Sequence, residues 1–238
     1  DTCVVISCYS FVNLIGSVDS CIIGGIVAEG AATIKTSYCV FIGDITINSN
    51  RSNWISGLSC TGEPSRFITN CYVDVNITYT ANNTTNIYIG YITPFDTVNN
   101  TVYYTGRISN TSTAATINTS GTKLSDGAFK SGEVCYKLNT AIGSTVFYQS
   151  INSNYYPTFN SNEWKVLYNS SQTPPYYNNI PSFNNTISSY ADLITFRNLV
   201  NSGTTYNNQT ITLLSDIDIT GDEWIPIGTA TSPFNGVF

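Results

Sequence analysis

The sequence contains no histidine and few charged side chains, and both shortages narrow the possible functions. Histidine is the most frequent general base in enzymes and a frequent zinc ligand, so its absence argues against both roles. Only nine Lys and Arg residues are spread along 238 residues, which excludes a basic stripe for nucleic acid. No apolar run approaches the length of about 18 residues that a membrane-spanning helix needs. We therefore expect no enzyme, no nucleic-acid partner and no membrane span in this chain.

The residues that are abundant predict an all-β protein. Charged residues make up 10% of the chain and apolar residues 42%, with 17 tyrosines. Isoleucine, valine, threonine and tyrosine favour strands. Polarity comes from asparagine, serine and threonine, while lysine, leucine and glutamate are too sparse for long exposed helices. The formal net charge is −6.

Three columns of residues recur with nearly one period of about 32 residues. Such a period indicates stacked structural units rather than a single globular core. The columns comprise Cys8, Cys39 and Cys71; Gly25, Gly57 and Gly90; and Ile45, Ile77 and Ile108.

We interpret residues 1–120 as a parallel β-helix, or β-solenoid, with coils of about 32 residues. Each period has room for two or three short strands, and stacked coils would bury a ladder of isoleucine, valine and tyrosine. The recurring glycines would let the backbone bend between faces. The same strands could form an antiparallel sandwich, although their repeated positions favour the coil.

The period breaks after residue 120. Residues 121–168 are expected to close the array, with a helical or capping turn at Ser131–Asn139 and short strands at Val146–Tyr148 and Tyr155–Phe159. Residues 169–187, rich in proline, asparagine and serine, read as a stiff extended linker. Residues 188–238 predict the start of a following module, with a helix at 189–202 that Ser189 caps and a strand at 210–220.

Seven cysteines without a Cys-x-x-Cys pair favour disulfides in an oxidising compartment over a zinc site. The cysteines outside the column are the better disulfide candidates. The column of Cys8, Cys39 and Cys71 is equally well explained by small inward-facing residues that stack. The off-column candidates are Cys3, Cys21, Cys60 and Cys135.

Asn-x-Ser/Thr sequons support a secreted, N-glycosylated protein, although a chain of this composition acquires many by chance. The alternation of apolar residues in Val73–Tyr79 places Asn76 on the solvent face, where a glycan would leave a core undisturbed. The sequons begin at Asn50, Asn76, Asn82, Asn83, Asn99, Asn110, Asn118, Asn169, Asn184 and Asn208.

Two further kinds of site were weighed. Asp216 and Asp218 lie two residues apart, with Asp222 and Glu223 nearby, and could share a structural calcium ion, but a solvated strand face explains them better. No other metal or cofactor is expected. The tyrosine pairs could stack on sugar rings, but packing in a core or linker is the favoured explanation. These pairs are Tyr103–Tyr104, Tyr155–Tyr156 and Tyr176–Tyr177.

Several segments resemble the GLUG repeat of large secreted adhesin-like proteins. Two segments, Ile23–Val27 with Tyr38–Cys39 and Thr69–Tyr72 with Asn76–Thr78, carry the repeat-like residues. Ser131–Asn139 followed by Tyr155–Pro157 is similar to the segment that closes such an array. Leu213–Ile219, Glu223–Gly228 and Phe234–Phe238 are similar to the segment that opens one. The resemblance implies a β-helical, extracellular, stalk-like module, and it implies no ligand.

The order of these segments, the end of one module before the start of another, suggests head-to-tail stacking on further copies or on neighbouring modules of the same chain. The expected interface comprises Val4, Ile6, Phe234, Val237 and Phe238. We therefore expect an extracellular structural or adhesive module of a glycosylated surface stalk or filament. The alternatives are a fragment of a long adhesin, a carbohydrate-binding surface module and, less favoured, a polysaccharide-active β-helix enzyme.

Overall fold

The computed structural model describes residues 2–16, 21–28, 33–49, 53–60, 66–80, 87–95, 101–111, 114–151, 153–161, 163–180, 182–220 and 224–238. The chain divides into two compact units. The first unit contains residues 1–128 and 140–143, and the second contains residues 129–139 and 144–238. Each unit is described by itself.

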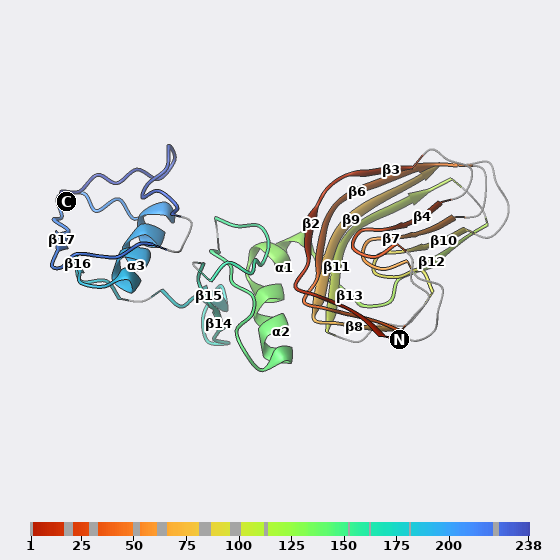
Figure 1. Ribbon diagram of the computed structural model, residues 1–238, viewed down its shortest axis with the longest axis horizontal. Helices are drawn as coiled ribbons and strands as arrows, with labels where there is room; N and C mark the ends of the chain where they lie inside the picture. The colour runs from red at the N-terminus through yellow and green to blue at the C-terminus, as the bar shows by residue number, and fades with distance from the viewer. Residues whose placement is uncertain are drawn as a thin grey trace. The chain divides into compact units, whose positions relative to one another are not determined.

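The described strands of the first unit form three parallel sheets, whose curved strands follow one another in Figure 1. One sheet has the order β1 (Thr2–Ile6), β5 (Thr33–Ser37), β8 (Arg66–Thr69). The second has the order β4 (Cys21–Gly24), β7 (Asn53–Ser56), β10 (Ile87–Gly90), β12 (Ala115–Asn118). The third contains β2 (Tyr9–Phe11), β3 (Leu14–Gly16), β6 (Val40–Asn48), β9 (Cys71–Thr80), β11 (Val102–Asn110) and β13 (Thr122–Lys123). The predicted β class with parallel strands is confirmed, and the antiparallel sandwich is wrong for this unit.

The periodic columns of the sequence become ladders of paired residues. Ile45 pairs with Ile77, which pairs with Ile108, along β6, β9 and β11. Ile45 and Ile77 have no solvent exposure. A one-residue slip would turn these side chains to the opposite face, so the isoleucine ladder holds the strands in register.

In the long strands β6 and β9, buried and exposed side chains alternate only along the second half of the strand. From Asp44 to Asn48, and from Asp74 to Thr80, inward residues are buried while their neighbours are exposed or half-buried. The first residues of β6, β9 and β11 are buried on both faces. Tyr103 and Tyr104 are both buried for this reason.

Two members of the glycine column, Gly25 and Gly57, mark close approaches between backbones of successive repeats. A Cβ atom on Gly57 would lie 2.3 Å from the carbonyl oxygen of Tyr91, and one on Gly25 would lie 2.1 Å from the carbonyl oxygen of Gly57. Real Cβ atoms do not approach an oxygen so closely, so no larger residue fits here without a backbone shift. The chain also bends at Gly25 and Gly57, as expected, so these glycines combine the bend with close packing.

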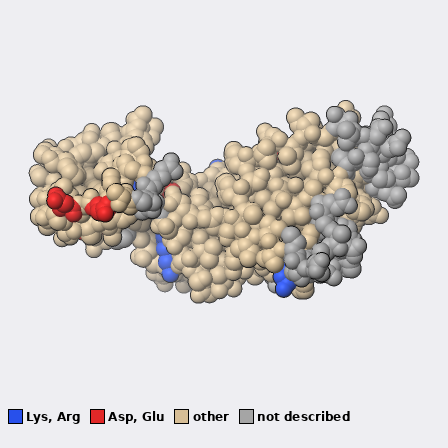
Figure 2. Space-filling view, in the orientation of Figure 1, with Lys and Arg blue, Asp and Glu red and all other residues tan. Residues whose placement is uncertain are grey.

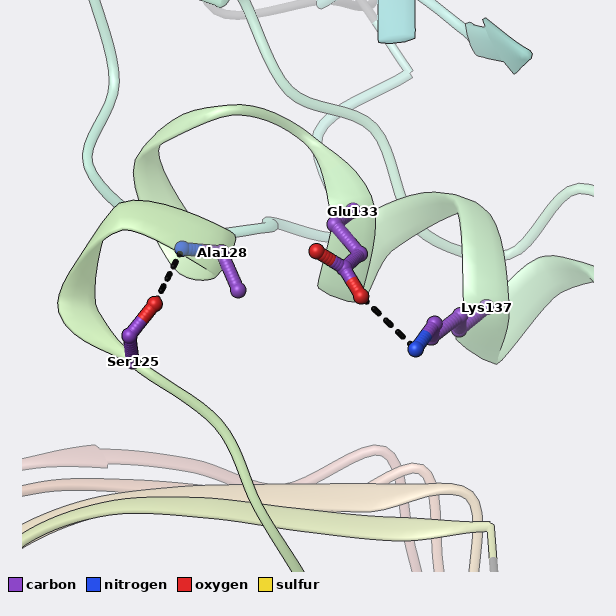
Figure 3. A network of polar contacts seen from close by, with 4 residues as sticks. All are labelled: Ser125, Ala128, Glu133 and Lys137. Carbon is purple, nitrogen blue, oxygen red and sulfur yellow. Dashed lines mark hydrogen bonds and ion pairs between the residues drawn. The ribbon is translucent and has the colours of Figure 1, made fainter. Parts of the chain in front are cut away.

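Two helices follow the sheets. The N–H of Ala128 in α1 (Asp126–Lys130) donates to Ser125 Oγ at 3.3 Å, and Lys137 Nζ in α2 (Glu133–Ile142) lies 2.7 Å from Glu133 Oε1 (Figure 3). The helical turn expected at Ser131–Asn139 is thus part of a ten-residue helix.

Buried amides hold the chain between α2 and residue 180. Asn139 Nδ2 donates to the carbonyl oxygen of Phe147 at 2.7 Å, and its Oδ1 accepts from the N–H groups of Val146 and Phe147 at 2.9 Å. Gln149 Nε2 donates to the carbonyl oxygen of Phe129 at 2.7 Å. Because side chains supply these bonds, the segment needs little strand structure. The strands expected at Val146–Tyr148 and Tyr155–Phe159 are reduced to one bridge between Tyr148 and Thr158.

Residues 169–187 are not a free linker. β14 (Val166–Tyr168) and β15 (Tyr176–Asn178) pair in antiparallel fashion, so the proline-containing stretch between them is a connecting loop. The rings of Tyr136, Tyr168 and Tyr176 contact one another, with centroids 5.1 to 5.7 Å apart. Aromatic packing overrides the linker-like composition of this segment.

The last part of the second unit surrounds α3 (Tyr190–Asn201). β16 (Thr186–Ile187) pairs in parallel with β17 (Thr212–Leu213), and Thr210 forms a parallel bridge with Val237. The strand expected at 210–220 is therefore only two residues long. The described strand pairing ends at Leu213, and most side chains of residues 214–220 are exposed. The core here comprises Ile187, Phe196, Val200, Tyr206 and Ile211.

A reciprocal hydrogen-bonded cap begins α3. Ser189 Oγ accepts from the N–H of Asp192 at 3.2 Å, and Asp192 Oδ2 accepts from the N–H and Oγ of Ser188 at 3.1 and 2.9 Å. The backbone hydrogen bond from Ser188 is the main cause that lowers the pKa of Asp192.

We expect Ser189→Ala to lower the free energy of unfolding of the second unit by about 1 kcal/mol, because the helix loses its N-cap. For Asp192→Asn the loss should depend on pH. Since the folded-state pKa is depressed, the carboxylate stabilises the fold fully above the usual aspartate pKa of about 4, and this contribution disappears as pH falls below that value. Urea unfolding across that range measures the effect. A difference between wild type and Asp192→Asn that persisted in acid would contradict this account.

Candidate interaction surfaces

The three sheets of the first unit share an edge formed by the first strands of the chain. In each sheet the strands run in chain order, so β1, β4 and β2 with β3 are outermost on one side. Among the described strands, these have a partner on one side only. Unpaired N–H and C=O groups of such strands are able to pair with another chain. We call the described residues of this edge, 2–16 and 21–24, the leading edge.

The leading edge is more apolar than the repeat beside it. Tyr9 and Phe11 are 47% and 72% exposed, whereas their register partners Val40 and Ile42 are 0% and 5% exposed. Ile15 is 81% exposed opposite Thr46. Val4 and Ile6, also exposed, pair with Lys35 and Ser37. Positions that are covered or polar in the second repeat are thus apolar and uncovered in the first.

A second apolar surface lies at the end of the second unit. Exposed here are Leu213, Leu214, Ile219, Ile225, Val237 and Phe238. Of the expected interface residues, Val237 and Phe238 are each 61% exposed. Phe234 packs on Phe196, with ring centroids 5.4 Å apart, so it contributes to the core of its own unit. We call the six exposed residues the trailing surface.

The cysteine column is a stack of free thiols. Cys8, Cys39 and Cys71 are all unpaired by disulfides. The N–H of Cys39 donates to Cys71 Sγ at 3.3 Å, and Cys71 Sγ donates to the carbonyl oxygen of Thr69 at 3.1 Å. The Cys71 thiol stabilises the Cys39 thiolate and lowers the Cys39 pKa, while burial raises the pKa of Cys71. The column therefore consists of small inward-facing residues.

The off-column cysteines divide into two groups. Cys60 and Cys135 are buried and are not joined in a disulfide, so neither forms the bond for which it was a candidate. Cys60 belongs to the first unit and Cys135 to the second. The backbone of Cys3 and Cys21 lies in β1 and β4, but their side chains lie outside the described residues.

We expect Cys135 of the native protein to resist alkylation at pH 8. Burial raises its pKa to about 12, so almost no thiolate is present for reaction. Labelling with iodoacetamide followed by peptide mass analysis should detect Cys135 modification only after denaturant is added. Rapid labelling of the native protein would show that this thiol is not buried.

The sequons differ in accessibility. Asn76, Asn184 and Asn208 are exposed, and Asn110, Asn118 and Asn169 are half-buried. Asn76 Nδ2, the atom to which a glycan would be attached, donates to Asp44 Oδ1 at 3.0 Å. The remaining sequons, Asn50, Asn82, Asn83 and Asn99, lie outside the described residues.

The acidic pair does not form a cluster in the described structure. Asp216 and Asp218 are exposed, and Asp218 Oδ1 accepts from the N–H and Oγ1 of Thr220 at 2.9 and 2.7 Å. These two hydrogen bonds lower the pKa of Asp218. Asp222 and Glu223 lie outside the described residues, and within them no group of three potential metal ligands occurs. The geometry fits a turn.

The tyrosine pairs do not present a flat aromatic platform. Tyr103 and Tyr104 are buried, and Tyr91 stacks on Tyr104 with centroids 4.4 Å apart. Tyr155 and Tyr156 contact each other at 4.4 Å, and Lys130 Nζ lies 4.5 Å from the ring centroid of Tyr155. Tyr176 and Tyr177 are half-buried in β15. Core and local packing account for these rings.

The visible face of the molecule is largely uncharged, as Figure 2 shows. Among the described residues, no helix combines the length and the apolar character needed to cross a membrane. A comparison with protein-family models, curated proteins and solved structures found no match to this chain.

Proposed function

We propose that this chain is an extracellular structural or adhesive β-solenoid module that assembles head to tail with further copies of itself. In this proposal the sheets of the first unit are successive faces of coils that stack at a period of about 32 residues. Its function would lie in length and surface display rather than in catalysis.

The apolar leading edge is the observation that carries the proposal. Apolar side chains as exposed as those of Tyr9 and Phe11, whose register partners in the second repeat are buried, are unusual in a soluble protein unless something covers them. The same edge offers strand backbones that can pair. A further repeat of the same kind would cover the apolar side chains and pair with the strand backbones. Its strands would lie parallel to those of the leading edge, with apolar residues in register.

The segment that carries the trailing surface contains parallel strand pairs of its own. Thr186 pairs with Thr212 and Thr210 with Val237, so parallel pairing recurs there with offsets of 26 and 27 residues. Its exposed residues would stack on the leading edge of the next copy. An interface whose two halves differ does not close into a two-fold dimer, and it gives an open filament when successive copies do not close into a ring.

The exposed sequons and the low charge support an extracellular location. Glycans at Asn76, Asn184 and Asn208 would replace the charged side chains that usually keep a surface hydrated. The free thiols of the described cysteines do not add to this argument.

Sedimentation and negative-stain electron microscopy of the purified chain test the proposal. We expect association that grows with concentration and produces filaments or short chains of modules. Phe11→Asp should abolish it, because its register partner Ile42, which has strands on both sides, is only 5% exposed, so a charge at Phe11 would be buried in the interface. Ile15→Asp is the matched control and should assemble normally, because its register partner Thr46 stays exposed between two strands. A wild type that stays monomeric as its concentration rises, or equal effects of both variants, would refute head-to-tail assembly.

A further inference from the structure

The second unit contains a polar pocket, which shares only Ile225 with the trailing surface. Its volume is about 140 Å³, below the range of roughly 300 Å³ and more that is typical of sites for drug-sized ligands, so it suits one small molecule. Its lining is dominated by hydroxyl, amide and charged side chains, among them Ser150, Asn154, Asn160, Glu163, Arg197 and Asn201.

Arg197 is the unusual member of this lining. The side chain is 1% exposed, and Nε donates to Asn198 Oδ1 at 3.0 Å. The indole of Trp224 lies against the guanidinium, with the ring centroid 5.4 Å from Cζ. Neither Nη1 nor Nη2 has a hydrogen-bond partner among the described residues. Buried guanidinium nitrogens without acceptors are rare, since their desolvation is uncompensated.

The two free nitrogens of Arg197 match one chemical group. A guanidinium presents two parallel N–H donors, and a carboxylate accepts both in a bidentate arrangement. Burial lowers the pKa of Arg197, but arginine remains a cation at neutral pH. Glu163 lines the same pocket, so a doubly charged anion such as phosphate would be repelled.

The remaining lining matches hydroxyl groups. Serine hydroxyls and asparagine amides both donate and accept hydrogen bonds, as sugar hydroxyls do. Glu163 adds an acceptor, and its Oε2 accepts a hydrogen bond from Ser150 Oγ. Next to this pocket, Tyr155 and Lys130 line a second hollow that shares Ser153 and Asn154 with the first.

We propose that this pocket binds a monosaccharide acid, with its carboxylate on Nη1 and Nη2 of Arg197 and its hydroxyls on the serine, asparagine and Glu163 side chains. A module on a cell surface would thereby recognise acidic sugars through its second unit.

Isothermal titration with D-glucuronate at low ionic strength tests the proposal, with D-glucose and L-alanine as comparison ligands. We expect glucuronate to bind at least ten times more tightly than glucose, which has the same ring without the carboxylate. Alanine, which offers a carboxylate and an ammonium but no hydroxyls, should also bind at least ten times more weakly. Equal binding of glucose, tighter binding of alanine or no binding of glucuronate would each overturn the assignment.

Arg197→Gln should reduce glucuronate affinity at least tenfold, and Arg107→Gln, which removes an exposed guanidinium of β11, should leave it unchanged. Because Arg197 is buried, its loss could unfold the unit, so circular dichroism of the variant is required. A second readout needs no substitution at Arg197: in ¹⁵N-arginine-labelled protein, glucuronate should shift one arginine Nε–H resonance that persists in Arg107→Gln. An unchanged arginine spectrum under saturating glucuronate would refute the proposal.

Discussion

Gly57→Ala is expected to destabilise the first unit by about 3 kcal/mol, which corresponds to a fall in melting temperature of roughly 10 °C. The added Cβ would lie 2.3 Å from the carbonyl oxygen of Tyr91 and 2.6 Å from Val73 Cγ1. A rotamer change can move the valine methyl group, but the carbonyl oxygen belongs to the backbone of the next repeat. The sheets must therefore separate locally, with loss of the hydrogen bond from the N–H of Gly57 to that oxygen.

Thermal unfolding followed by circular dichroism measures this effect. Gly127→Ala in α1 is the matched control, since its Cβ would approach nothing closer than Ser125 Oγ at 3.5 Å. That variant should be neutral or more stable by up to about 1 kcal/mol, because alanine favours helix. Equal melting temperatures for Gly57→Ala and wild type would mean that the repeats do not approach as closely as described.

Ile77→Ala should lower the free energy of unfolding by about 4 kcal/mol. Ile77 has no solvent exposure and pairs with Ile45 on one side and Ile108 on the other. Truncation removes three carbon atoms from the centre of this ladder. Neighbours on both sides are held by strand hydrogen bonds, so they cannot move in to fill the cavity.

Chemical denaturation of the first-unit signal tests this expectation against Ile117→Ala. Ile117→Ala is the same substitution on β12, but the side chain of Ile117 is 44% exposed. Its truncation should cost less than about 0.5 kcal/mol. Similar losses in both variants would indicate that β9 does not lie at the centre of the core.

The repeat pattern predicted the strand pairing of the first unit because burial and register share one physical cause. Ile45, Ile77 and Ile108 recur in sequence because they occupy one ladder in space. The same pattern predicted the bend at Gly57 but not the close approach of this glycine to the backbone of Tyr91. Distances between backbones depend on how neighbouring repeats pack, which a single repeat does not reveal.

The second unit was harder to predict because side-chain contacts override composition there. The proline-rich stretch looked like a linker, yet the rings of Tyr168 and Tyr176 bring its two ends together. The side-chain amides of Asn139 and Gln149 form hydrogen bonds with the backbone in place of a neighbouring strand. Such contacts leave no periodic pattern in the sequence. Strands of two or three residues are too short to show an alternating apolar pattern in the sequence.

Arg197 was missed as a site residue, although the sequence carries a signal for it. It follows Leu193 by four residues and precedes Val200 by three, so it lies on the same side of the helix as the expected apolar face. A lone cation at such a position must find a compensating partner or ligand. That reasoning indicates a site, but the pocket and its other lining residues come from distant segments.

Parallel pairing between adjacent repeats also shapes how the first unit should come apart. β6 and β9 each have neighbours on both sides, whereas β1 and β4 have one. Amide hydrogen exchange should therefore be slowest in β6 and β9 and fastest at the leading edge, as the outer strands open without the inner ones. Capping of that edge by another copy would slow exchange there, so a protomer would gain rigidity from its neighbour without any change in its own fold.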